Sequence, residues 1–165
     1  MTADAVDTSH ASFWQRPLTF PPGLEYERRL VLSARALSPD RLTVTARLVD
    51  AEHEGELELE IDPHGIVQVA RVTFKGPFPQ CAKVRGLGHR MLGLSVVRDQ
   101  GRLPAELANV RGCFHALELA APAFRFATNV LATARVGWDV MHPPGPETYE
   151  RMREAGCDRC LAFEP

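Results

Sequence analysis

The sequence predicts an α+β domain in which an antiparallel meander sheet packs against the helices that follow it. In the first half of the chain, apolar and polar residues alternate with a period of two, which is typical of strands that are buried on one face. Short turn sequences separate these strands, and in the second half the apolar spacing changes to three and four residues. A chain of 165 residues is long enough for one domain with a sizeable core.

The first two strands are predicted to form a hairpin. Alternation begins at Tyr26 and continues to Ala36, and the turn sequence Ser-Pro-Asp follows at 38–40. Polar residues occupy the odd positions of 41–48, so they are expected on the opposite face from the apolar ones. The apolar face consists of Leu42, Val44, Ala46 and Leu48.

Two further strands continue the meander. Leu57, Leu59 and Ile61 alternate with glutamates, and the turn at 62–65 leads into a fourth strand over 66–74. Antiparallel sheets commonly have one solvated face, and we expect the glutamates to lie there. These are Glu56, Glu58 and Glu60.

Helices are predicted after the sheet. Segment 81–94 is a weak candidate because glycines interrupt it, and 103–108 forms a short turn of helix. A stronger helix begins near residue 112 and extends towards 134, although Pro122 must begin a new helix or kink this one. A last helix is expected over 146–155, with proline at its start.

The predicted domain spans 23–165, and residues 1–22 are expected to be an extended, mobile arm. No signal peptide or long apolar run is found, so we expect a cytoplasmic protein without a membrane partner. The 19 basic and 21 acidic residues are mixed along the chain, which argues against a nucleic-acid partner. Four cysteines are too few for a disulfide scaffold.

Chemistry is most strongly indicated at residues 110–119. If a helix begins near Gly112, Cys113 lies in its first turn, where free amides and the helix dipole stabilise a thiolate. His115 and Glu118 are three residues apart and therefore share a helical face. The simplest structural alternative is a capping cysteine, a core histidine with one hydrogen bond, and a solvent-facing glutamate.

Three chemical hypotheses fit these residues. In the first, zinc is bound by Cys113 and His115 with one or two of Cys81, Glu118 and His53, which are ligand types that zinc accepts. The spacing is unlike that of a closed structural zinc site, which pairs its ligands from two places. The metal-ligand candidates are Cys81, Cys113 and His115.

The other two hypotheses need no metal. His115, oriented by Glu118, could transfer a proton while Arg29 or Arg111 holds a carboxylate or enolate oxygen. Alternatively, His115 activates Cys113 as a nucleophile for acyl transfer. The sequence identifies no oxyanion hole, so the nucleophile hypothesis ranks below proton transfer.

The segment Arg-Gly-Cys-Phe-His at 111–115, followed by Glu118, resembles the hallmark of bacterial domain-of-unknown-function family 2889, in which Arg-Gly-Cys-Thr-His-Leu is usual. The resemblance covers roughly residues 25–163. It includes an Arg-Arg pair at 28–29, Leu-Val-Asp at 48–50, and later His53, Cys81 and a cysteine at 157 or 160. The departures are Phe114 in place of threonine, Glu54 in place of aspartate after the histidine, and a C-terminal Cys-Asp-Arg-Cys in place of Cys-His-Ala.

The resemblance implies that His53, Cys81, Cys113, His115 and Glu118 belong together. We assign catalysis to Cys113, His115 and Glu118, and substrate binding to Arg29, Arg111 and His53. The predicted function is a lyase, isomerase or hydrolase that uses acid–base chemistry, with or without a metal, on a carboxylated or acyl small molecule. The alternatives are a non-enzymatic ligand-binding domain and a zinc-stabilised interaction domain. Zinc is the one cofactor left open, and a homo-oligomer is compatible with the sequence.

Overall fold

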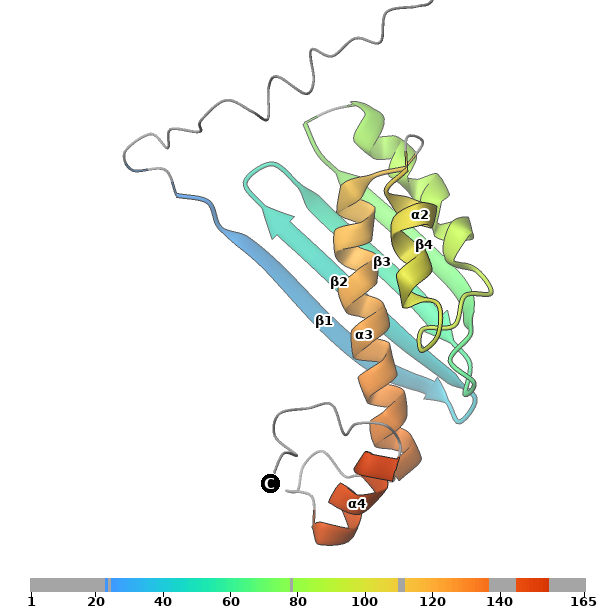
Figure 1. Ribbon diagram of the computed structural model, residues 1–165. Helices are drawn as coiled ribbons and strands as arrows, with labels where there is room; N and C mark the ends of the chain where they lie inside the picture. Colours follow the sequence, from blue (N-terminus) through green and yellow to red (C-terminus); the bar gives the residue numbers. More distant parts are fainter. Residues whose placement is uncertain (1–22, 24, 78, 110–111, 137–144, 155–165) are drawn as a thin grey trace, which may run out of the picture.

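The computed structural model describes residues 23, 25–77, 79–109, 112–136 and 145–154. Within this part of the chain, a four-stranded antiparallel sheet is followed by helices that pack on one of its faces (Figure 1). The predicted α+β fold is therefore confirmed. The predicted arm at 1–22 lies outside the described residues.

The sheet is a simple meander with the strand order β1-β2-β3-β4. Each strand pairs antiparallel with the next one along the chain. The turn between the last two strands is held by Asp62, whose carboxylate accepts hydrogen bonds from the backbone N–H groups of His64 and Ile66. The strands are β1 (Arg28–Ser38), β2 (Arg41–Asp50), β3 (Glu54–Ile61) and β4 (Val67–Lys75).

The predicted alternation places one face of the sheet in the core. In the register, Ala46 lies between Leu32 of β1 and Leu57 of β3, so residues of one parity line the same face. Ala46 and Leu57 are fully buried. On the opposite face, ion pairs form across the strands, including Arg41 with Glu60. The predicted division into an apolar and a charged face is therefore correct for β2 and β3, whereas β1 is exposed along its length except at the half-buried Leu32.

The helical half begins with a 3-10 helix where the sequence predicted a weak helix. Glycines at 86 and 88 lower the helix propensity of this segment. The last long helix runs through Pro122 as one element. The elements are η1 (Pro79–Met91), η2 (Gln100–Arg102), α2 (Leu103–Leu107), α3 (Phe114–Val136) and α4 (Pro146–Glu154).

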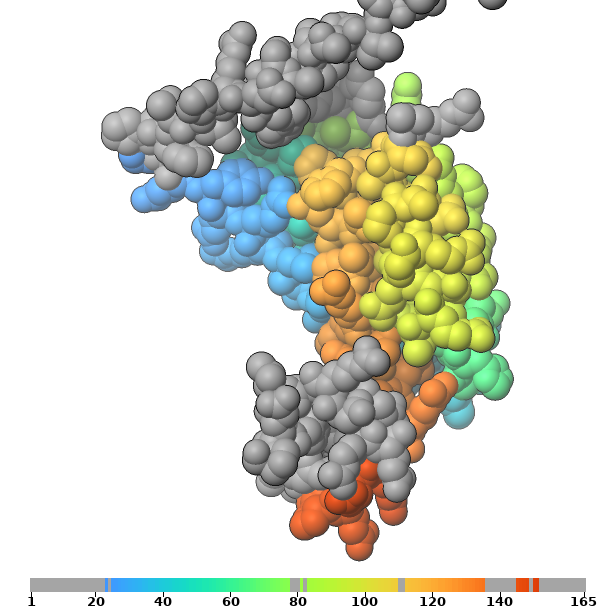
Figure 2. Space-filling model, in the orientation of Figure 1, coloured from blue at the N-terminus to red at the C-terminus, as the bar shows by residue number. Residues whose placement is uncertain are grey.

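Small residues let α3 approach the sheet closely. Its buried side includes four alanines, Ala116, Ala120, Ala123 and Ala127, together with Leu119 and Phe124. The short helix α2 packs beside α3. The edge strand β1 (blue) lies on the other side of α3 from α2 (Figure 2). None of the described helices is sufficiently long and apolar to span a bilayer.

The topology brings several strand ends together at one end of the sheet. Successive strands of an antiparallel meander run in opposite directions. The same end of the sheet therefore contains the start of β1, the end of β2, the start of β3 and the end of β4. The first turn of α3 lies over this end of the sheet (Figure 1). Side chains that are far apart in the sequence therefore meet there.

Candidate functional site

Gly112 positions the first turn of α3. A Cβ atom on this residue would overlap the carbonyl oxygen of Leu107 at the end of α2, so only glycine fits. The next amide, on Cys113, donates to the same carbonyl over 2.6 Å. The carbonyl of Cys113 accepts from the amide of Ala116, so Cys113 occupies the cap position of the helix.

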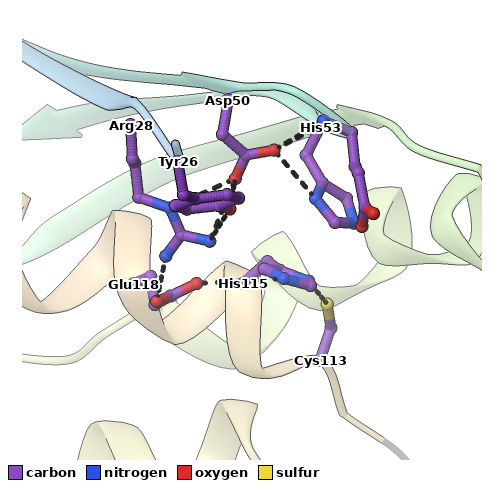
Figure 3. Close-up of polar contacts among 8 residues, drawn as sticks. Tyr26, Arg28, Asp50, His53, Cys113, His115 and Glu118 are labelled. Carbon is purple, nitrogen blue, oxygen red and sulfur yellow. Dashed lines mark hydrogen bonds and ion pairs between the residues drawn. The ribbon is translucent and has the colours of Figure 1, made fainter. Parts of the chain in front are cut away.

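His115 lies between a thiol and a carboxylate. Its Nδ1 is 3.9 Å from the sulfur of Cys113, and its Nε2 is 4.0 Å from Oε2 of Glu118 (Figure 3). The second distance is longer than a hydrogen bond, and Oε2 of Glu118 is buried without a hydrogen-bond partner. A thiol, an imidazole and a carboxylate are thus arranged in series over the cap and the first two turns of one helix.

A second histidine reaches the same place from the sheet. The loop between β2 and β3 folds back so that the buried carboxylate of Asp50 accepts hydrogen bonds from the backbone N–H groups of Glu52 and His53. The same oxygen lies 3.1 Å from Nδ1 of His53. Because an ionised carboxylate only accepts hydrogen bonds, the contact requires a proton on Nδ1, so Nε2 is the acceptor of the neutral ring.

Arg28 connects the two carboxylates. Its guanidinium donates to Asp50 through Nε over 3.1 Å and forms a close ion pair with Glu118. It also donates to the hydroxyl of Tyr26, which in turn donates to Asp50 over 2.8 Å. The network fixes Glu118 relative to the sheet, so the carboxylate beside His115 is held from a different element.

The two imidazole rings lie against one another, with their planes tilted by 36°. The ring centroids of His53 and His115 are 4.1 Å apart, and the ring of Phe74 lies 5.5 Å from His115 and 5.6 Å from His53. Two imidazolium charges at this separation repel each other. The neighbouring His53 therefore disfavours a positive charge on His115.

The environment shifts the pKa of two of these groups. Burial lowers the pKa of His115, as do the neighbouring His53 and Arg28, and these effects outweigh the opposing influence of Glu118 and Asp50. Burial alone would raise the pKa of Asp50, but hydrogen bonds from the backbone of Glu52, from Tyr26 and from His53 hold it well below its usual range. At neutral pH, His115 is therefore neutral and Asp50 is ionised.

The two histidines line a pocket of about 580 Å³ together with Cys113 and Arg28. One wall is η1, which contributes the thiol of Cys81, the apolar side chains of Val84 and Leu87, and the exposed Lys83. The wall lies close to the histidines because Gly76 has no side chain, and a Cβ there would be 2.7 Å from the sulfur of Cys81 and 2.9 Å from Cδ2 of His53. The complete lining is Tyr26, Arg28, Glu52, His53, Cys81, Lys83, Val84, Leu87, Gly112, Cys113 and His115.

Most of the predicted site residues converge. His53, Cys81, Cys113 and His115 all line the pocket, and Glu118 lies beside His115. Arg29 does not line it. Its side chain is 75% exposed and pairs with Glu27. Neighbouring residues on a strand face opposite sides, so Arg28 takes the place that the sequence analysis gave to Arg29. Arg111, also predicted to bind substrate, lies outside the described residues.

Sequence reasoning missed three members of the network, which are Tyr26, Arg28 and Asp50. A usable signal existed for one of them, since Asp50 precedes His53 by three residues at the end of a strand, where a carboxylate can accept hydrogen bonds from the following turn. The pairing of Arg28 with Asp50 follows from the strand register, which the sequence leaves open.

The described residues do not support the zinc hypothesis by their geometry. Among them, no group of three or more histidine, cysteine, aspartate or glutamate side chains is arranged to hold a metal ion. The candidate ligands Cys81, Cys113 and His115 therefore line one pocket without forming such a group. Cys157 and Cys160 lie outside the described residues.

Comparison of the chain with protein-family models, curated proteins and solved structures finds no match in any of the three. The resemblance to family 2889 stays a prediction from the motif. The function must therefore be argued from the site itself.

Proposed function

We propose that this protein is an enzyme that transfers a proton to or from a small carboxylated or acyl compound, with His115 as the acid–base group. The observation that carries the proposal is the position of the His115 ring, which lines a pocket between a thiol and a carboxylate whose Oε2 is buried. General acid–base catalysis needs an imidazole within hydrogen-bonding reach of a bound substrate, and a ring in the lining of a pocket meets this requirement.

The lowered pKa of His115 supports the role of a base. A neutral imidazole at neutral pH has a free lone pair for a substrate proton. Once protonated, the ring lies 4.0 Å from the unpartnered oxygen of Glu118, which stabilises the imidazolium. His53, with its proton fixed on Nδ1 by Asp50, offers Nε2 as a second acceptor beside the first ring.

Lys83 is the residue best placed to bind the carboxylate of a substrate. Arg28 is already engaged with Asp50, Glu118 and Tyr26, so it serves to position these groups. Lys83 lines the same pocket and has no ion-pair partner among the described residues. An ammonium group at the rim of an otherwise partly apolar pocket favours a carboxylate on the bound molecule.

The proposal is tested by proton NMR of the protein in D₂O with a panel of 2-oxo acids, 2- and 3-hydroxy acids, and acyl esters. We expect deuterium to enter at a carbon next to a carbonyl, or the substrate to be converted, for at least one compound. His115→Asn should reduce the rate by a factor of about 100 or more. His89→Asn, a change at an exposed histidine of η1, is the matched control and should leave the rate unchanged.

Binding of a panel compound without exchange or conversion would favour the alternative of a ligand-binding domain. A rate that His115→Asn leaves unchanged would contradict the role of His115. Circular dichroism of His115→Asn, compared with the wild type, checks that the variant is folded.

A further inference from the structure

We propose that Cys113 is a nucleophile that forms a thioester with the acyl group of a substrate. This inference rests on the proposed function, because it uses the same pocket and the same histidine. It extends that function from proton transfer to covalent acyl transfer, and it narrows the substrate class to esters and thioesters whose acyl group fits the pocket.

The first argument is the alignment of three groups. The sulfur of Cys113 faces Nδ1 of His115 at 3.9 Å, and Glu118 faces Nε2 of the same ring at 4.0 Å (Figure 3). A nucleophile, a base and a carboxylate that orients the base make up the general arrangement of covalent acyl transfer. The carboxylate is itself fixed by Arg28 from the sheet.

The second thiol in the pocket provides a contrast. Cys81 also lines the cavity, yet within the described part of the chain its sulfur makes no hydrogen-bond contact with an imidazole nitrogen. Of the two cysteines that the structure describes, Cys113 alone combines access to the pocket with a base at hydrogen-bonding range for sulfur. The same cavity thus contains a candidate nucleophile and a reference thiol.

The third argument concerns the charge that develops on the substrate oxygen. Cys113 caps α3, and the backbone N–H groups of the next two residues, Phe114 and His115, have no acceptor among the described residues. Amides that follow a nucleophile in the first turn of a helix are a common source of oxyanion stabilisation. These two amides are therefore the candidate donors to the oxyanion.

The reaction proceeds in balanced steps. His115 takes the thiol proton at Nδ1 as the sulfur of Cys113 attacks the carbonyl carbon, which forms a C–S bond and a tetrahedral oxyanion. The oxyanion collapses, the bond to the leaving oxygen or sulfur breaks, and His115 returns the proton to the leaving group. Water, deprotonated by His115, then attacks the thioester, and the thiol and a free carboxylic acid are regenerated.

The inference is tested on the full chain with p-nitrophenyl acetate and iodoacetamide. Intact and peptide mass spectrometry after brief exposure to the ester should locate one acetyl group on Cys113. In a separate reaction at pH 7, we expect iodoacetamide to alkylate Cys113 about tenfold faster than Cys81 in the same molecule. Cys113→Ser should abolish the thioester, while His115→Asn should lower alkylation of Cys113 to the rate of Cys81. His89→Asn is the matched control for the histidine change.

Acetylation at other residues only, or equal alkylation of the two thiols with no effect of His115→Asn, would overturn the nucleophile. The proposed function is contradicted by a different result, namely a rate of exchange or conversion that His115→Asn leaves unchanged. If Cys113→Ser retains deuterium exchange and no thioester forms on Cys113 of the wild type, the nucleophile is overturned while proton transfer by His115 stands. If neither exchange nor acylation occurs in the folded protein, both proposals are wrong.

Discussion

Arginine–carboxylate pairs occur in two regions of this protein, with opposite surroundings. On the open face of the sheet, Arg71 pairs with Glu58 and Glu60, and Lys75 pairs with Glu54, whose side chain is 43% exposed. At the end of the sheet, the side chain of Asp50 that pairs with Arg28 is 0% exposed. Both regions pair a basic side chain with a carboxylate, but water can replace a lost partner only on the open face.

The difference in exposure between the two sets of ion pairs indicates which region supports the pocket. Exposed pairs gain little, because solvent and salt screen them and each long side chain loses freedom on pairing. In the enclosed network, every hydrogen bond of Asp50 positions a group that lines the pocket or touches one that does. We therefore regard the open face as a solvated surface and the enclosed network as the support of the site.

The largest effect is expected for Asp50→Ala. The change leaves the hydroxyl of Tyr26, two backbone N–H groups and the charge of Arg28 without their acceptor, so the free energy of unfolding should fall by about 3 kcal/mol or more. Urea unfolding at pH 7 measures the change. A loss no larger than that of a substitution on the open face would contradict the comparison.

The pH dependence provides a second measurement on the same residue. The folded-state pKa of Asp50 lies below its unfolded value of about 4, so its contribution to stability is present above that pH and is lost as the pH falls through the folded-state value. In Asp50→Asn, unfolding free energy should therefore change less steeply below about pH 4 than in the wild type. Equal slopes would contradict this account.

Gly112→Ala should have the next largest effect. The added Cβ would overlap the carbonyl of Leu107, and relieving the overlap should cost about 1–3 kcal/mol and displace Cys113 from His115. Alkylation of Cys113 should slow in parallel. Gly101→Ala is the matched control, because a Cβ there meets no atom within 4 Å. Equal stability of the two variants would indicate that the close approach at Gly112 is unimportant.

A smaller effect is expected from the titration of His115. Burial lowers its folded-state pKa below the unfolded value of about 6.5, so the unfolded chain binds a proton first as the pH falls. This residue therefore lowers stability progressively below about pH 6.5, and His115→Asn should remove that part of the slope. Unfolding curves between neutral and mildly acidic pH, compared with those of His89→Asn, measure the difference.

The smallest effect is expected for Arg71→Ala on the open face. Glu58 is 37% exposed, and Glu60, which is 14% exposed, keeps its ion pair with Arg41, so the urea midpoint should stay within experimental error at low and high salt. A large, salt-dependent loss of stability would indicate that the charged face is more tightly organised than its exposure suggests.

Much of the fold could be predicted from local patterns. Alternation in β2 and β3 identified the buried residues Val44, Leu57 and Leu59, because the direction of a side chain on a strand depends only on parity. The helix start at Cys113 could also be predicted, since glycine precedes it. The 3-10 form of 79–91 could not, because glycine weakens a helix without specifying which alternative replaces it.

The sequence by itself determined that a thiol, an imidazole and a carboxylate lie within six residues at the start of a helix, because residues 113, 115 and 118 are held together by local geometry alone. Only the tertiary structure decided which side chains from the sheet join them. The choice of Arg28 over Arg29, and the role of Asp50, depend on strand register and on where α3 crosses the sheet. These are long-range packing relations, and no short segment of the sequence contains them.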